Sequence, residues 1–221
     1  MDQNTKKQRV AEAVLDYIDN GESLGIGSGS TVNILIENLS KVKNKIRNVV
    51  SSSVKSTELL EANGFEVSEL RDVGKLTKYI DGADEINKDL QMIKGGGGAL
   101  TREKILAHNS NQFICIVDDS KKVDILGQFP LPIEVIPLSR SSVSLELIKH
   151  GGRPVLRENF VSDNGNLILD IHNLQIMEPI KLEQTINNIP GVVTNGIFAL
   201  DHANVLLCAS DNGVDKTDLN A

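Results

Sequence analysis

The chain has 221 residues, of which 40% are hydrophobic and 24% are charged, and this ordinary globular composition excludes wholesale disorder. Its formal net charge is −7, and no stretch supplies the basic face that nucleic-acid-binding proteins usually carry. Aromatic residues make up only 3%, too few for a platform that stacks single-stranded nucleic acid.

The sequence predicts a soluble, cytoplasmic protein without a membrane partner. Its first residues contain no apolar segment of the kind that a secretory signal needs. The longest uncharged stretch, residues 184–200, is interrupted by Asn, Pro and Gly, which is not typical of a membrane span. Cys115 and Cys208 lie in apolar runs without metal-like spacing, so we expect both to be buried structural residues of a protein in a reducing compartment.

Strands alternate with helices in the first part of the chain. Apolar spacing and glycine stops predict, in order, a helix at 5–19, a strand at 23–26, a helix at 31–39, a strand at 48–51, a helix at 55–63, strands at 67–70 and 77–80, a helix at 99–108 and a strand at 113–117. Several of these strands are apolar on both faces. This pattern predicts a parallel sheet with helices on each side.

The pattern changes after Pro130. The segments predicted there are a strand at 133–137, a helix at 141–149, strands at 153–157 and 166–171, a helix at 180–188 and a strand at 192–199. This β-α-β-β-α-β order is typical of a ferredoxin-like α+β domain. A strand at 205–209 is expected to return to the first domain, and the polar tail at 211–221 is expected to fray. The predicted domains are therefore 1–130 plus 201–221, and 131–200.

A glycine-rich turn, GIGSGST at residues 25–31, links the first predicted strand to the next helix. It lacks the third glycine of the dinucleotide fingerprint, since Ser30 stands there, and it lacks the Lys of a P-loop. Its glycines let backbone N–H groups converge at the positive end of a helix dipole, and Ser28, Ser30 and Thr31 add hydroxyl groups. The turn indicates a site for a phosphate monoester, and the alternative is a structural, N-capped turn.

Three carboxylates follow the strand at 77–80, in the sequence DGADE. Asp81, Asp84 and Glu85 come where parallel α/β sheets place their ligands. Crowded carboxylates suit general acid–base work, because each charge disfavours ionisation of the next. A divalent cation site and a solvated acidic turn are the alternatives.

The segment KGGGGALTREK, residues 94–104, is the most informative. Four consecutive glycines cost chain entropy and permit close approach of the backbone to a ligand. Lys94 precedes them as a cation, and Glu103 lies one turn into the helix that follows. Lys121 and Lys7 are weaker candidates, because an isolated Lys is usually a surface charge.

The chain resembles the ribose-5-phosphate isomerase type A family, from about residue 6 to about residue 210. The resemblance rests on these segments, in order: GIGSGST, DGADEI, KGGGGALTREK, VDDSKKVDILG, PLPIEV, GGRPVLREN, SDNGNLILD and IPGVVTNGIF. Two departures are small. Ser28 stands where the family usually has Thr, which keeps the hydroxyl, and Thr194 stands where an acidic residue is common.

This resemblance implies a reversible interconversion of ribose 5-phosphate and ribulose 5-phosphate through an enediolate, without a metal or organic cofactor. It implies that Glu103 moves the proton between C2 and C1, and that Lys94 with backbone N–H groups stabilises the enediolate oxygen. Asp81 is implied as the group that opens the sugar ring and Asp84 as the one that orients Lys94, although the sequence leaves open which aspartate opens the ring. The implied substrate contacts are Ser28, Gly29, Ser30, Thr31, Asp81, Gly82, Ala83, Asp84, Lys94, Gly95, Gly96, Gly97 and Lys121, with Lys7 as a further candidate.

The resemblance also implies a fold and an assembly: a Rossmann-like α/β/α domain with a smaller ferredoxin-like α+β domain, in a homodimer or tetramer. Because the smaller domain contains no candidate chemical residues, we expect it to take part in subunit contacts. The main alternative function is a non-catalytic sugar-phosphate sensor, but about 20 residues before the first strand are too few for a helix-turn-helix. A nicotinamide-dependent dehydrogenase would need the missing glycine. Metal-dependent phosphate hydrolysis through the DGADE carboxylates is the third alternative.

Overall fold

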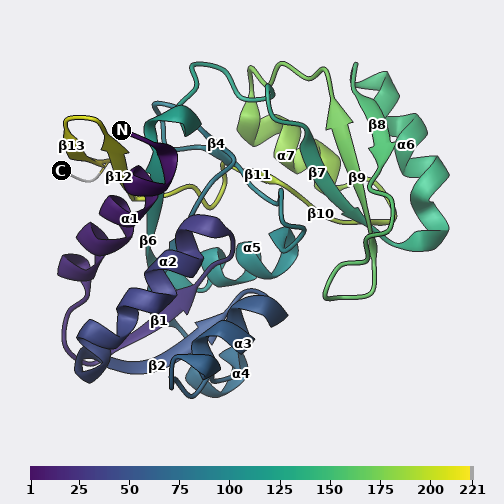
Figure 1. Cartoon of the computed structure of the whole chain (residues 1–221). Helices are drawn as coiled ribbons and strands as arrows, with labels where there is room; N and C mark the ends of the chain where they lie inside the picture. Colours follow the sequence, from purple (N-terminus) through teal and green to yellow (C-terminus); the bar gives the residue numbers. More distant parts are fainter. Residues whose placement is uncertain (220–221) are drawn as a thin grey trace. The chain divides into compact units, whose positions relative to one another are not determined.

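The computed structural model in Figure 1 describes residues 1–219 of the chain. The chain divides into two units. Unit 1 consists of Met1–Ala83, Arg102–Lys121 and Ala203–Ala221, and unit 2 consists of Asp84–Thr101 and Lys122–His202.

Unit 1 is built on a mostly parallel sheet that is six-stranded within the described residues. Its order is β13-β12-β6-β3-β1-β2, with bounds β1 (Glu22–Ile26), β2 (Ile46–Ser51), β3 (Leu76–Asp81), β6 (Ser110–Asp118), β12 (Val205–Ser210) and β13 (Gly213–Asp218). Only β13, at one edge of this sheet, pairs antiparallel. The chain adds β2 on one side of β1 and β3 on the other, so the neighbouring ends of β1 and β3 form the switch point of a doubly wound sheet.

Helices cover both faces of this sheet, as the alternation of elements predicts. On one face, α1 (Gln3–Ala13), α2 (Ser30–Asn38) and α3 (Val54–Ala62) bury apolar side chains in one cluster with those of β1, β3, β6 and β12. On the other face, Leu106 of α5 (Leu100–His108) lies over Gly25, where a Cβ would also stand 2.8 Å from Leu76. Shorter helical segments are η1 (Val14–Tyr17), η2 (Leu39–Lys45), α4 (Leu70–Val73) and η3 (Asp119–Lys121).

Unit 2 contains an antiparallel sheet of order β10-β7-β9-β8. Its elements are β7 (Leu131–Val135), η4 (Pro137–Ser139), α6 (Arg140–Lys149), β8 (Arg153–Leu156), β9 (Leu167–His172), α7 (Pro179–Asn187) and β10 (Val192–Asn195). The fourth strand lies beside the first and the third beside the second, which is the ferredoxin-like arrangement. A further small sheet joins β4 (Glu85–Ile86), β5 (Met92–Ile93) and β11 (Ile197–Phe198).

The limits of the two units differ from the expected domain boundaries. Residues 84–101 and 122–130 belong to unit 2 rather than to the first domain. The reason is pairing: β5 pairs with both β4 and β11, and the Glu85 carboxylate accepts hydrogen bonds from the N–H groups of Gly127 (2.8 Å) and Phe129. The prolines near residue 130 mark the start of β7 instead of a boundary.

Two local predictions were wrong. Residues 67–70 do not form a strand: Val67 makes one isolated bridge to Val49, and Leu70 begins α4. The two apolar residues are three positions apart, which is a helical rather than a strand spacing. The tail also does not fray, because β13 pairs with β12 through a two-residue turn at Asp211 and Asn212. Residues 220 and 221 lie outside the described part of the chain.

Candidate active site

The glycine-rich turn follows β1 at the switch point. Its backbone is tied on both sides, since the Gly27 N–H donates to the Ile80 carbonyl (3.0 Å) and the Gly27 carbonyl accepts from the Ser56 hydroxyl (2.8 Å). Gly29 has a φ of +103° and caps α2, which begins at Ser30. Gly29 and Ser30 are exposed, and Thr31 is partly buried. The turn therefore presents backbone N–H and hydroxyl groups to solvent at a helix N-terminus.

Asp81, the last residue of β3, is completely buried beside this turn. Its Oδ1 accepts hydrogen bonds from the N–H of Ser28 (3.0 Å) and of Gly82 (2.7 Å), and its Oδ2 accepts one from the Tyr79 hydroxyl. A Cβ on Gly27 would lie 1.9 Å from the Asp81 carboxyl carbon. Glycine at position 27 is thus what allows the turn to close over this carboxylate.

Tyr79 lies two residues before Asp81 on the same face of β3 and is also completely buried. Its ring packs against Phe113, with 4.7 Å between ring centroids. Burial, followed by the negative charges of Asp81 and Glu103, raises the pKa of Tyr79 well above its usual value. The phenol therefore stays protonated and donates to the Asp81 carboxylate.

Glu103, on α5, is 3% exposed. The Ser28 hydroxyl donates to its Oε1 over 2.6 Å, while the Ser28 backbone N–H donates to Asp81. One residue of the turn thus bridges two buried carboxylates that come from different elements. A pair of carboxylates held in this way can accept and return protons from a ligand at the end of the sheet.

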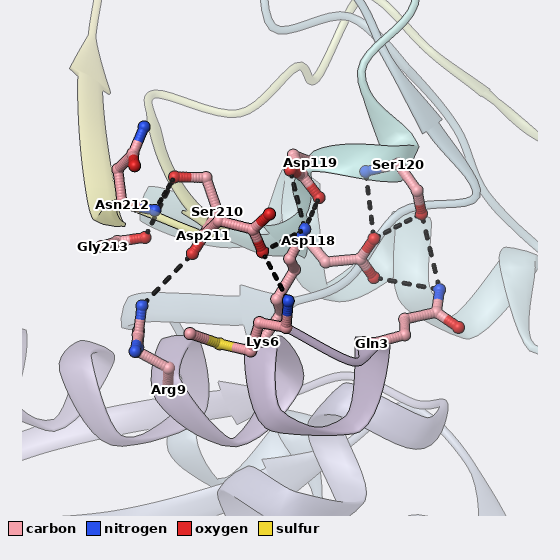
Figure 2. Close-up of polar contacts among 11 residues, drawn as sticks. Gln3, Lys6, Arg9, Asp118, Asp119, Ser120, Ser210, Asp211, Asn212 and Gly213 are labelled. Atoms are coloured by element: carbon pink, nitrogen blue, oxygen red, sulfur yellow. Dashed lines mark hydrogen bonds and ion pairs between the residues drawn. The ribbon is translucent and has the colours of Figure 1, made fainter.

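Lys121 ends the short helix η3, which is held by α1 (Figure 2). Gln3 of α1 donates to Asp118 Oδ2 (3.2 Å), and Lys6 pairs with Asp119 (2.9 Å) and with Asp211 (3.2 Å). Burial opposes ionisation of Asp118, but hydrogen bonds from Ser120 and Gln3, together with the charge of Lys121, hold the pKa of this carboxyl below its usual value. These contacts fix the backbone that carries Lys121. Lys7, on the same helix α1, is partly buried.

The remaining candidate residues belong to unit 2. Asp84 is partly buried, and its Oδ2 accepts the Gly96 N–H over 2.8 Å. Lys94 is 3% exposed, with its ammonium 5.4 Å from the centre of the Phe198 ring. Gly96 and Gly97 are exposed, whereas Gly95 is buried and has a φ of +102°. Glu85, the third carboxylate of DGADE, accepts hydrogen bonds from backbone N–H groups of the loop at 127–129, so it holds that loop instead of a ligand.

The structure therefore connects Ser28, Asp81 and Glu103 in one network and joins Asp84 to Gly96. Sequence reasoning missed Tyr79: its position two residues before Asp81 places both side chains on one face of β3, but nothing in the sequence identifies the hydrogen bond between them.

Within residues 1–219, no group of three or more His, Cys, Asp or Glu side chains is arranged to hold a metal ion. None of the helices in that part of the chain has the length and apolar character needed to cross a membrane.

Together these features define an α/β protein of the doubly wound class, with a ferredoxin-like unit and two buried carboxylates at the switch point of its parallel sheet. Residues 48–213 match the family model described as ribose 5-phosphate isomerase A (phosphoriboisomerase A). The chain belongs to this family.

Similar proteins match nearly the whole chain. It is 52% identical over 214 residues to the ribose-5-phosphate isomerase A of Buchnera aphidicola subsp. Acyrthosiphon pisum (strain Tuc7), a match that covers 97% of this chain and 96% of that one. The crystal structure of ribose 5 phosphate isomerase A from Neisseria gonorrhoeae matches with a TM-score of 0.96 and 46% identity, covering 98% and 97% of the two chains. A D-ribose-5-phosphate isomerase in complex with phospho-erythronic acid matches with a TM-score of 0.95 and 34% identity, covering 99% and 100%.

Proposed function

We propose that this chain is an aldose–ketose isomerase that interconverts ribose 5-phosphate and ribulose 5-phosphate in the non-oxidative pentose phosphate pathway. The observation that carries the proposal is the bridge that Ser28 makes between two buried carboxylates, Asp81 and Glu103, in a chain of the isomerase family. An isomerisation of this kind needs groups that move protons, a group that stabilises an oxyanion and a holder for the phosphate, and it needs no redox partner.

In the proposed mechanism, Glu103 is the base. Its carboxylate takes the proton from C2 of the open-chain aldose, which leaves an enediolate. The hydroxyl proton on O2 passes to O1, and Glu103 returns its proton to C1 to give the ketose. Burial supports this role, because a carboxylate kept from bulk water returns the same proton before it exchanges. The hydrogen bond from Ser28 to Oε1 fixes the carboxylate.

We assign stabilisation of the enediolate oxygen to Lys94 and to backbone N–H groups of the glycines that follow it. A buried ammonium placed before charge develops is more effective than one in water. The backbone of Lys94 is fixed, since its N–H donates to the Gly196 carbonyl over 2.9 Å. Asp84 is assigned to orient Lys94 and the sugar hydroxyls.

Asp81 is assigned to open the sugar ring by proton transfer with the ring oxygen and the C1 hydroxyl, supported by its burial and its fixed position beside the turn. The turn at Ser28, Gly29, Ser30 and Thr31, together with Lys121, is assigned to the polar and phosphate end of the substrate, with Lys7 as an added cation. Gly82, Ala83, Gly95, Gly96 and Gly97 complete the proposed contacts. Neither a metal nor an organic cofactor enters these steps.

We also propose that the chain works in the cytoplasm as a homo-oligomer, a dimer or a tetramer, with unit 2 forming subunit contacts. Unit 2 exposes several large apolar side chains on η4 and α6, namely Leu138 (96% exposed), Leu145 (63%) and Ile148 (54%). Such side chains on one continuous helical segment favour protein–protein contact.

Glu103→Gln tests the assignment of the base, because it keeps the shape of the side chain and removes its ability to take a proton. We expect kcat for ketose formation from ribose 5-phosphate to fall by about 10²–10⁴, with chelator present throughout. The matched control is Glu58→Gln on α3, an exposed glutamate of unit 1, which keeps the wild-type kcat. Tight binding of ribose 5-phosphate without turnover by the wild type would instead indicate a sugar-phosphate sensor.

A further inference from the structure

Arg157, the residue that follows β8, contacts the backbone of the glycine-rich segment. Its Nη1 donates to the carbonyl oxygen of Gly96 over 3.1 Å and to that of Gly95 over 3.3 Å. Gly95 and Gly96 are the two residues that follow Lys94, and Arg157 is more than 60 residues away from them in the sequence. No role for Arg157 follows from the proposed chemistry, since its guanidinium binds carbonyl groups and not a ligand.

Besides the two glycine carbonyls, the Asp170 carboxylate and the Phe160 ring contact the guanidinium. Its Nε and Nη2 donate to the two carboxylate oxygens of Asp170 on β9, over 2.9 and 2.5 Å, and this fork geometry fixes the plane of the group. The Phe160 ring lies 5.3 Å from the guanidinium carbon. Phe160 also covers Gly98, where a Cβ would lie 2.1 Å from the ring. Arg157 and Asp170 are 17% and 19% exposed, so the pair is largely shielded from water.

The two carbonyl contacts determine where the neighbouring N–H groups point. In a trans peptide, C=O and N–H of the same peptide group point in opposite directions, and the peptides here are trans. The carbonyl of Gly95 points at Arg157, and the N–H of Gly96 accordingly points away from it, onto Asp84 Oδ2 at 2.8 Å. By the same geometry, the carbonyl of Gly96 on Arg157 turns the Gly97 N–H away from the guanidinium. The Gly96 N–H is thus engaged by Asp84, and the Gly97 N–H is the donor that is turned to the side away from Arg157, where it can meet an anionic oxygen.

We infer that Arg157, held by Asp170, is a positioning residue for the isomerisation: it fixes the peptides of Gly95 and Gly96, so that the Gly96 N–H holds Asp84 and the Gly97 N–H is aimed before the enediolate forms. This inference rests on the proposed function. Four glycines in a row are the most flexible backbone a chain can have, so a donor array built on them needs an external anchor. Arg157 supplies that anchor without touching the substrate.

The consequence is a loss of transition-state stabilisation when the anchor is removed. Preorganised donors lower the barrier because they need no reorientation as charge develops, and removing one donor costs about 10²–10³ in kcat in a known oxyanion hole. Loosening the Gly97 donor without deleting it should cost less. We expect Arg157→Met to lower kcat by about 10–100-fold and to change KM by less than about threefold, since the ground-state sugar carries no charge at that oxygen.

The experiment compares Arg157→Met and Arg157→Lys with Arg153→Met. Arg153 is an exposed arginine at the start of the same strand, β8, so its substitution removes the same charge and side chain without touching the glycine-rich segment. Each variant is assayed with ribose 5-phosphate and titrated with phospho-erythronic acid, whose planar carboxylate carries charge as the enediolate does. Circular dichroism and thermal melting are measured alongside.

The expected result is a fall in kcat and a matching loss of phospho-erythronic acid affinity for both Arg157 variants, with wild-type values for Arg153→Met. Guanidinium ions at millimolar concentration should partly restore the activity of Arg157→Met. If that variant does not fold, Arg157→Lys decides, because one ammonium group keeps the charge but cannot bind Asp170 and two carbonyls together; it should lose at least about fivefold in kcat.

Two results would overturn the inference: a kcat within twofold of wild type in a folded Arg157 variant, or a fall in kcat with unchanged affinity for phospho-erythronic acid. Both are distinct from failure of the proposed function, in which the wild-type protein itself would not form ketose.

Discussion

At the scale of single residues, the buried pair of Tyr79 and Asp81 has a consequence for stability at high pH. The pKa of Tyr79 is raised in the folded chain by burial and by the two neighbouring carboxylates, whereas in the unfolded chain the pKa returns to its ordinary value of 10.0. Below pH 10 both states keep the phenolic proton, and the contribution to stability is fully present. Above pH 10 the unfolded chain releases a proton that the folded chain retains, so the free energy of unfolding falls as the pH rises.

We therefore expect Tyr79→Phe to flatten the loss of stability between pH 10 and pH 11. The phenylalanine variant lacks the group that titrates, and the wild type should lose up to about 1.4 kcal/mol more per pH unit than the variant. Urea unfolding at pH 8, 9, 10 and 11 measures this difference. Equal slopes in the two proteins above pH 10 would show that Tyr79 ionises in the folded state.

The residues that carry the proposed chemistry could largely be named from the sequence, because glycines and carboxylates that follow a predicted strand can be recognised in the sequence alone. Tyr79 and Arg157 could not be assigned a role in the same way. A Tyr in an apolar strand is typical of core packing, and an Arg after an exposed strand is typical of a surface charge. Their roles depend on partners, Asp81 in one case and glycine carbonyls in the other, that only the folded backbone identifies.

At the scale of elements, the junction between α1 and η3 links the beginning of the chain to the proposed phosphate contact Lys121. Lys6 is the centre of this junction, and the hydrogen bonds to Asp119 and then to Asp211 raise its pKa, which keeps the ammonium charged. If the junction is lost, η3 is held by fewer contacts and Lys121 is less well placed.

Lys6→Met is accordingly expected to raise KM for ribose 5-phosphate several-fold while kcat changes by less than about twofold. The reason is that phosphate binding is shared by the substrate and the transition state. Lys41→Met is the matched control. Lys41 also pairs with a residue of α1, since its ammonium lies 3.4 Å from the carboxylate of Glu12, but this ion pair is exposed and far from η3 in the sequence. An equal KM for the two variants would mean that the junction has no effect on Lys121.

The order of the larger elements was predictable from apolar spacing and glycine stops, but small and edge elements were not. β13 is an edge strand whose outward side chains are charged, among them Asp215 and Lys216, so its composition is typical of a tail. β4, β5 and β11 have two residues each, too short for any alternation to be visible. Such short strands form because they pair with segments that are distant in the sequence, as β5 does with β11.

At the scale of the whole molecule, the limits of the units reflect pairings that no local signal reveals. Residues 84–101 separate β3 from α5 in the sequence, yet β5 within them pairs with β11, about 100 residues later. The expected boundary at Pro130 used a local break in the pattern. The chain instead leaves unit 1 after Ala83, returns at Arg102, leaves again after Lys121 and returns at Ala203.

The proposed oligomer is tested at this scale. We expect the double substitution Leu138→Asp and Leu145→Asp to lower the molar mass measured by light scattering, because two charges would be buried without partners in the proposed subunit contact. Val54→Asp is the control, since Val54 is an exposed apolar residue of unit 1 (48%). An unchanged mass for the double variant would show that subunits meet elsewhere or that the chain is a monomer.

The place of β12 in the sheet of unit 1 determines when that sheet can be completed during synthesis on the ribosome. β6 lies between β3 and β12 in the sheet, and β12 begins only at Val205. While residues 122–202 are being translated, one apolar edge of β6, including Ile114 and Ile116, has no neighbouring strand. An open edge of this kind can pair with another nascent chain, so the period before the last residues emerge is when this protein most needs a chaperone.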